Sequence, residues 1–212
     1  DSEQLWRIAP LVYGLGILLL IAVLIFYNRA VAAQTGAKSW FSLGPISFQP
    51  SEVMKPAYIL MLGRVVTQHN NEYPEHTMRS DWLLIGRLAL WTLPVMVLLK
   101  LQNDFGTLLV FIAILGGVVL VSGVTWKILA PAIAVATAIG GTALALAATD
   151  AGRAILTHVG FKTYQFNRID AWLHPFDNTA STSLQLSQSL KAIGSGQLFG
   201  KGFNVVQVHV PV

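Results

Sequence analysis

Two oppositely charged side chains stand at the start of a mostly apolar stretch. Glu52 and Lys55 lie three residues apart, just after Gln49-Pro50-Ser51. Residues at this spacing share one face of a helix, so a carboxylate and an ammonium placed there can pair. Charges at the edge of a bilayer are costly and usually mark a functional site. Residues 36–64, a loop followed by a helix, therefore contain the first candidate site.

The composition places this site in a membrane protein. Of the 212 residues, 54% are hydrophobic and 11% are charged, whereas soluble domains carry about 25% charged residues. The net charge of +4 is spread along the chain without a Lys/Arg run, which argues against nucleic acid as a partner. We therefore predict an all-α polytopic membrane protein surrounded by membrane lipids.

Five apolar stretches approach the length of about 20 residues that a membrane-spanning helix needs. They are residues 5–27, 50–66, 82–99, 105–121 and 128–148. The second stretch is short and holds Lys55, Pro56 and Arg64, which makes it the least lipid-like of the five. The polar residues 67–81 are predicted to form a loop between the second stretch and the third.

The division of the chain follows from these spans. Residues 1–148 are predicted to form the membrane helices, with 36–52 as an outer loop, and residues 149–212 to form one long loop. Five spans place the 36–52 loop, the 100–104 turn and the long loop on the same side of the membrane. The Lys/Arg bias of the short loops is too even to orient the chain by itself.

A second acid, Asp104, stands on that shared face at the start of the fourth span. An isolated acid in this position is most often a helix cap, because its carboxylate accepts backbone N–H groups and suits the helix dipole. Its place on the same face as Glu52 and Lys55 favours a shared polar cavity instead. Trp40 lies between Lys38 and the start of the second span. It has two interpretations as well: an interfacial belt residue or part of the site.

The long loop shows internal order. Residues 161–177 mix aromatic and polar side chains and are expected to lie along the membrane surface. Residues 182–193 place Leu186, Leu190 and Ile193 on one side, which predicts a short amphipathic helix. The glycine-rich residues 194–202 lack the spacing of a nucleotide-binding P-loop, although their backbone N–H groups and Lys201 would suit an anionic lipid headgroup.

The five histidines show no spacing typical of metal ligands. No HExxH motif and no Gly-x-Ser-x-Gly elbow is present. The residues therefore predict no metal ligands and no resident cofactor, and they leave open whether a divalent cation takes part.

Several motifs together resemble the RodA/FtsW family of multi-pass membrane enzymes, also called SEDS proteins. They are Gly36-Ala37-Lys38-Ser39-Trp40, Phe48-Gln49-Pro50-Ser51-Glu52-x-x-Lys55, Gln102-x-Asp104-Phe105-Gly106-Thr107, and Ser189-Leu190-x-Ala192-Ile193-Gly194-Ser195-Gly196 followed by Gly200-Lys201-Gly202. They occur in the family's order across most of the chain. Tyr164-Gln165-Phe166-x-Arg168-Ile169 with Trp172-Leu173-x-Pro175-Phe176 is more similar to the RodA branch of Gram-positive bacteria.

The resemblance implies a peptidoglycan glycosyltransferase of the bacterial plasma membrane that polymerises lipid II during cell-wall elongation and shape maintenance. It also implies a class B penicillin-binding protein, a transpeptidase, as partner. The family has about ten spans of about 20 residues each, so this chain is expected to be a central piece of a single SEDS domain. The long loop is then expected to be extracytoplasmic and incomplete.

The resemblance also assigns roles to residues. It implies that Glu52 and Lys55 form a cavity ion pair and that Asp104 is a cavity acid. Substrate-binding candidates are Trp40, Gln49, Arg168, Gln188 and Lys191. The family's catalytic aspartate follows the Val-Pro segment of the long loop, so it is expected after Val212 and no catalytic residue is assigned within the chain.

Two other functions compete with this one. A lipid II flippase would also use charged residues inside spans, but it does not require a large ordered outer loop. A generic small-molecule transporter is less well supported, because the sequence shows no inverted repeat of broken helices.

Overall fold

The computed structural model describes residues 2–43, 46–75, 77–158, 160–161, 163–173, 181–197, 200 and 202. Within this part of the chain, helices account for nearly all of the regular structure. The prediction of an all-α architecture is confirmed, with one small hairpin added. The chain divides into two compact units, Asp1–Ala132 and Ile133–Val212.

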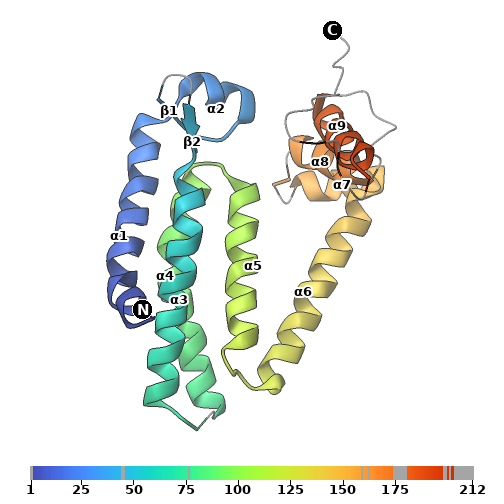
Figure 1. Ribbon diagram of the computed structural model, residues 1–212. Coiled ribbons are helices and arrows are strands. Elements are labelled where there is room, and N and C mark those ends of the chain that lie inside the picture. The colour runs from blue at the N-terminus through green and yellow to red at the C-terminus, as the bar shows by residue number, and fades with distance from the viewer. Residues whose placement is uncertain are drawn as a thin grey trace. The chain divides into compact units, whose positions relative to one another are not determined.

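The described part of the first unit is a bundle of long helices (Figure 1). It contains α1 (Ser2–Phe26), α3 (Pro50–Glu72), α4 (Met78–Leu101), α5 (Phe105–Val121) and the first residues of α6 (Trp126–Ala147). α1 packs along α3, and α3 contacts both α4 and α5. The helices correspond closely to the five predicted apolar stretches.

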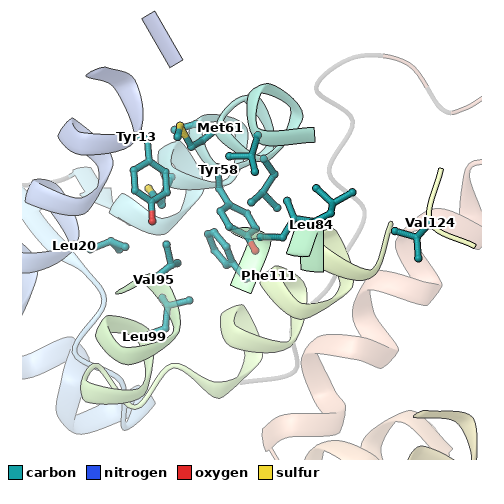
Figure 2. Packing of buried hydrophobic residues seen from close by; sticks show 14 of the residues in the cluster. Tyr13, Leu20, Tyr58, Met61, Leu84, Val95, Leu99, Phe111 and Val124 are labelled. Atoms are coloured by element: carbon teal, nitrogen blue, oxygen red, sulfur yellow. The ribbon is translucent and has the colours of Figure 1, made fainter. Parts of the chain in front are cut away.

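Buried aromatic side chains hold α3 against its neighbours (Figure 2). The rings of Tyr58 on α3 and Phe111 on α5 have centroids 5.1 Å apart. The Tyr58 hydroxyl lies 2.6 Å from Thr92 Oγ1 on α4, and Thr92 in turn donates to the carbonyl of Leu88 at 2.7 Å. An unpaired hydroxyl buried here would cost about 1–3 kcal/mol, so these bonds permit polar groups inside the bundle and fix how α3 and α4 pack.

Within the described residues, three helices are long and apolar enough to span a membrane: Gln4–Phe26, Met78–Leu101 and Trp126–Ala147. α5 is apolar but shorter. α3 has the length, but its polar and charged side chains, among them Glu52, Lys55 and Arg64, lower its hydropathy. A multi-pass membrane protein is thus supported, and the number of five spans stays a prediction.

Two predicted loops are partly ordered into regular structure. The predicted loop 67–81 is wrong in extent, because α3 continues to Glu72 and α4 begins at Met78. The reason is local: Thr77 Oγ1 accepts a hydrogen bond from the Ser80 N–H and so begins α4 early. Between the first two predicted spans, α2 (Arg29–Thr35) comes before the predicted outer loop 36–52, and that loop contains a hairpin of β1 (Phe41–Leu43) and β2 (Ile46–Phe48).

In the described part of the second unit lie most of α6 and three shorter helices. They are α7 (Asp150–His158), α8 (Thr163–Leu173) and α9 (Ser181–Ser195). α9 confirms the helix predicted at 182–193, although Leu190 and Ile193 on its apolar side are exposed. α8 lies within the predicted segment 161–177, whereas residues 174–177 and the Val210-Pro211-Val212 segment lie outside the described residues.

A close backbone approach joins α7 to the end of α6. A Cβ added at Gly152 would lie 2.2 Å from the carbonyl oxygen of Leu146, far inside van der Waals contact. We expect Gly152→Ala to force α7 away from α6 and to cost about 1–3 kcal/mol of stability. Thermal unfolding of the purified full-length protein checks this. Gly194→Ala, at a helical glycine with open space around it, is the matched control and is expected to change little.

Candidate functional site

The outer loop and the α4–α5 turn are joined by hydrogen bonds at one end of the first unit. The Lys38 N–H donates to the carbonyl of Gln102 at 2.8 Å. The Gln49 side chain donates from Nε2 to Asp104 Oδ2 at 2.9 Å and lies 3.4 Å from Thr107 Oγ1. Residues more than 50 positions apart in the sequence therefore meet, as the shared polar face predicted.

Asp104 has two partners through its two carboxylate oxygens. Oδ1 accepts a hydrogen bond from the Thr107 N–H at 3.1 Å and caps α5, while Oδ2 accepts from Gln49. The preceding residue, Asn103, has φ of 58°, a left-handed conformation that asparagine tolerates better than most residues. This turn ends α4 and places Asp104 at the start of α5. Asp104 is therefore the cap of α5, and its place in a polar cavity shared with Glu52 and Lys55 stays a prediction.

Glu52 and Lys55 form the predicted ion pair. Lys55 Nζ lies 2.7 Å from Glu52 Oε1 in the first turn of α3. The Glu52 side chain is 58% exposed and the Lys55 side chain 25%, so the pair is accessible and is not a buried one. An exposed pair contributes about 0–1 kcal/mol to stability. Losing Glu52 is therefore expected to cost much less stability than the roughly 3–5 kcal/mol that breaking a buried ion pair costs.

Gln102 is a member of this site that the residue-by-residue prediction missed. Its side chain is fully buried, and Nε2 donates to the carbonyl of Leu20 on α1 at 3.0 Å. Its backbone carbonyl accepts the Lys38 N–H, so one residue connects α1, the outer loop and the end of α4. The signal was its place in the Gln102-x-Asp104 motif, but its partners come from segments that only the folded chain brings near.

We expect Gln102→Ala to lower the free energy of unfolding by about 2 kcal/mol, because it leaves a cavity and removes the bond to Leu20. Gln102→Leu refills the volume without the bond, so it separates packing from hydrogen bonding. Gln68→Ala, at an exposed glutamine on α3, is the matched control. Equal melting temperatures for Gln102→Ala and Gln68→Ala would contradict this role.

The other predicted substrate contacts divide between the two units. Trp40 is half-buried, and its carbonyl accepts the Asn28 N–H at 3.0 Å, which closes the outer loop at its base. Arg168 lies exposed on α8, Lys191 exposed on α9 and Gln188 half-buried on α9. These last three belong to the second unit, and their role in binding substrate stays a prediction.

A second polar cluster lies at the opposite end of α3 and α4, where no site was predicted. Arg87 donates to Glu72 Oε2 at 2.7 Å and lies 3.3 Å from Nδ1 of His69. This hydrogen bond from Arg87 lowers the pKa of the Glu72 carboxyl. The buried ring of His69 also lies 3.0 Å from Ser80 Oγ. The available signal was an arginine inside an apolar stretch, which needs a partner.

Asp81 ties the start of α4 to the turn between α5 and α6. Its side chain is fully buried, and Oδ2 accepts hydrogen bonds from the N–H of Thr125 at 2.9 Å and from the Thr125 hydroxyl. Nearby, Asn70 Nδ2 donates to the carbonyl of Ser122 at 3.1 Å. These contacts make that end of the bundle a structural junction. In the described residues, no group of three or more His, Asp or Glu side chains is arranged to hold a metal ion.

Comparison with known proteins relates the chain to one family. The family model FTSW_RODA_SPOVE, described as a cell cycle protein, matches residues 1–211. The chain is 30% identical over 230 residues to a probable peptidoglycan glycosyltransferase FtsW of Neisseria gonorrhoeae, covering 92% of the chain and 45% of that relative. It is 33% identical over 211 residues to the FtsW of Polynucleobacter necessarius, covering 97% and 45%. It thus spans about half the length of the curated relatives it matches.

A solved structure with 31% identity agrees with this relationship. A chain of a peptidoglycan synthase complex, studied for the coordination of polymerization and crosslinking, matches with a TM-score of 0.58 and 31% identity, covering 90% of this chain and 49% of that chain. The crystal structure of Thermus thermophilus RodA matches with a TM-score of 0.49 and 33% identity, covering 66% of this chain and 42% of that chain.

Proposed function

Because this chain belongs to the FtsW/RodA/SpoVE family, we propose that the protein containing it is a peptidoglycan glycosyltransferase of the bacterial plasma membrane. Its substrate is lipid II, a disaccharide-pentapeptide on an undecaprenyl pyrophosphate carrier. The curated relatives named as probable peptidoglycan glycosyltransferases support this activity. Among the described residues, three helices long and apolar enough to span a membrane support the location.

The observation that carries the proposal is the junction of two sequence motifs at one helix end. Gln49, from the motif that ends in Glu52 and Lys55, donates to Asp104 of the second motif at 2.9 Å. The two motifs are far apart in the sequence, yet Asp104 of the second motif contacts Gln49, directly before the N-terminus of α3. A scaffold alone does not require charges at this place, since they are costly near a bilayer.

In the proposed reaction, the 4-hydroxyl of the acceptor GlcNAc attacks C1 of the donor MurNAc. The bond from C1 to the undecaprenyl pyrophosphate breaks, and that pyrophosphate leaves. A carboxylate takes the hydroxyl proton, and nearby cations offset the charge on the leaving group. We assign proton transfer to the family aspartate expected after Val212, and we assign Glu52, Lys55 and Asp104 to the wall of the polar cavity.

The same proposal extends to substrate binding and to the partner. Trp40 and Gln49 are candidate substrate contacts from the outer loop. Arg168, Gln188 and Lys191 are candidates from residues 149–212, which would form part of an extracytoplasmic loop. The partner would be a class B penicillin-binding protein, in line with the synthase complex among the similar structures. The aromatic segment around Arg168 favours the RodA branch and a role in elongation, which rescue of a rod-shape mutant but not of a division mutant would test.

The ion pair gives the sharpest test of the site. We expect Glu52→Gln in the full-length protein to slow polymerisation of labelled lipid II by about 10–100-fold, because it removes the carboxylate that positions the Lys55 ammonium. The melting temperature should stay near that of the unmodified protein, since the pair is exposed. The assay uses the purified protein with its transpeptidase partner and measures glycan chains on a gel.

Glu75→Gln is the matched control, because Glu75 is an exposed acid in the turn between α3 and α4. If Glu52→Gln polymerises lipid II at the wild-type rate, the ion pair is not part of the proposed site. Absence of polymer from the unmodified protein at every partner ratio would overturn the glycosyltransferase. Movement of lipid II across vesicle membranes by a variant that cannot polymerise would favour the alternative, a lipid II flippase.

A further inference from the structure

A groove lies at the end of the first unit opposite Gln49 and Asp104, away from the proposed reaction. It is bounded by α1, α3 and α4 and has a volume of about 610 Å³. Two tryptophans, Trp6 and Trp91, form part of its walls. The charged side chains of Glu72 and Arg87 also line the groove, together with the exposed amide side chains of Gln68 and Asn71 on α3. An aromatic wall beside charged and amide groups suits a small polar ligand with both donors and acceptors.

The charges in the groove come as a balanced pair. Arg87 and Glu72 are joined at 2.7 Å, and their side chains remain 36% and 50% exposed. A purely anionic ligand bound to Arg87 would meet the Glu72 carboxylate, and a purely cationic ligand bound to Glu72 would meet the Arg87 guanidinium. A ligand that carries one positive and one negative charge can contact both groups without breaking their pair.

The tryptophans are held in place by other contacts, so the walls are already formed. The Arg64 guanidinium lies 4.1 Å from the centroid of the Trp6 ring and donates to the Trp6 carbonyl. The ring of Tyr13 meets Trp91 edge-on, with centroids 5.4 Å apart, and its hydroxyl donates to the Trp91 carbonyl. A preformed wall loses little side-chain freedom when a ligand binds.

The groove also lies at a suitable depth. α4 is one of the helices long enough to span a membrane, and Arg87 lies about two and a half turns from its start at Met78. The side chain reaches Glu72 at the last residue of α3, and Trp6 lies near the start of the candidate span Gln4–Phe26, so the groove opens near the ends of α1 and α3. Tryptophan is enriched at this level, among the lipid headgroups.

We propose that this groove binds the headgroup of a zwitterionic aminophospholipid. The phosphate contacts Arg87, the primary ammonium contacts Glu72, and the tryptophans flank the headgroup. The three N–H donors of a primary ammonium distinguish it from a choline headgroup, which has no N–H to offer a carboxylate. The acyl chains lie along the apolar exterior of the bundle.

Native mass spectrometry of the full-length protein in detergent tests the proposal. The probes are phosphatidylethanolamine, phosphatidylglycerol and phosphatidylcholine with matched acyl chains. We expect phosphatidylethanolamine to be retained about tenfold more strongly than either of the others. Equal or stronger retention of phosphatidylglycerol would overturn the proposal of a zwitterionic ligand in favour of a simple anion site. Equal retention of phosphatidylcholine would contradict the proposed contact between Glu72 and a primary ammonium.

Variants locate the binding. Glu72→Gln should reduce phosphatidylethanolamine retention about tenfold, whereas Glu75→Gln and Arg79→Gln, at exposed charges outside the groove, should not change it. Asn71→Phe replaces an exposed side chain and narrows the groove without removing a charge, so it should also reduce retention even if a charge variant folds poorly. Unchanged retention in both Glu72→Gln and Asn71→Phe would place the lipid elsewhere and overturn the proposal.

Discussion

Replacing Asp81 with alanine is expected to lower the free energy of unfolding of the full-length protein by about 3 kcal/mol. The buried carboxylate accepts hydrogen bonds from the N–H and the hydroxyl of Thr125. Alanine removes the acceptor and leaves both donors beside a void, and it detaches the α5–α6 turn from the start of α4. Chemical unfolding in detergent, followed by tryptophan fluorescence, measures the change.

Three variants separate this contact from a general effect of losing an acid. Asp81→Asn keeps an acceptor oxygen, so it should lower the free energy of unfolding less than alanine does. Thr125→Val should lower it by the part that the hydroxyl of Thr125 contributes. In the double variant, the two effects should not add, because they remove the same interaction. Asp150→Ala, at an exposed acid in the first turn of α7, is the control. Additive effects would show that Asp81 acts through other neighbours.

Replacing Asp104 with alanine is expected to reduce lipid II polymerisation by about 100-fold, with a loss of stability of about 1–2 kcal/mol. The substitution removes the cap of α5 and the acceptor for Gln49 at once. The outer loop is then no longer tied by this side chain to the α4–α5 turn. Polymerisation is measured in the same lipid II assay, and stability by thermal unfolding.

Two further substitutions distinguish the roles of the two carboxylate oxygens. Asp104→Ser retains a cap for α5 but is too short to replace both contacts. Asp104→Asn retains the cap and an acceptor oxygen while removing the charge. If the asparagine variant is stable and inactive, the charge matters for the reaction. If both variants polymerise at the wild-type rate, Asp104 is a cap and its assignment to the cavity is wrong.

The two ends of the bundle have different consequences for experiments. At the end with Glu52 and Asp104, the charged pair is exposed, so substitutions should change activity more than stability. At the other end, Asp81 and His69 are fully buried, so substitutions of these two residues should change stability first. A loss of activity at the second end therefore needs a folding measurement before it is interpreted.

The sequence by itself determined where the long apolar helices lie and the all-α class of the protein. The apolar stretches are long enough to require backbone hydrogen bonds within each segment, because a bilayer offers no water to replace them. Local signals such as Pro50 and Asp104 then mark where helices begin. The ion pair between Glu52 and Lys55 was also predictable, since its spacing of three residues depends on a single helix.

The tertiary structure decided which of these residues meet and which are accessible. The bond between Gln49 and Asp104, the burial of Gln102 against Leu20 and the contact of Asp81 with Thr125 all join segments far apart in the sequence. Spacing along the chain carries no information about such pairs, because they depend on how whole helices pack. For the same reason, the sequence showed that Glu52 and Lys55 can pair, and only the fold showed that the pair is exposed.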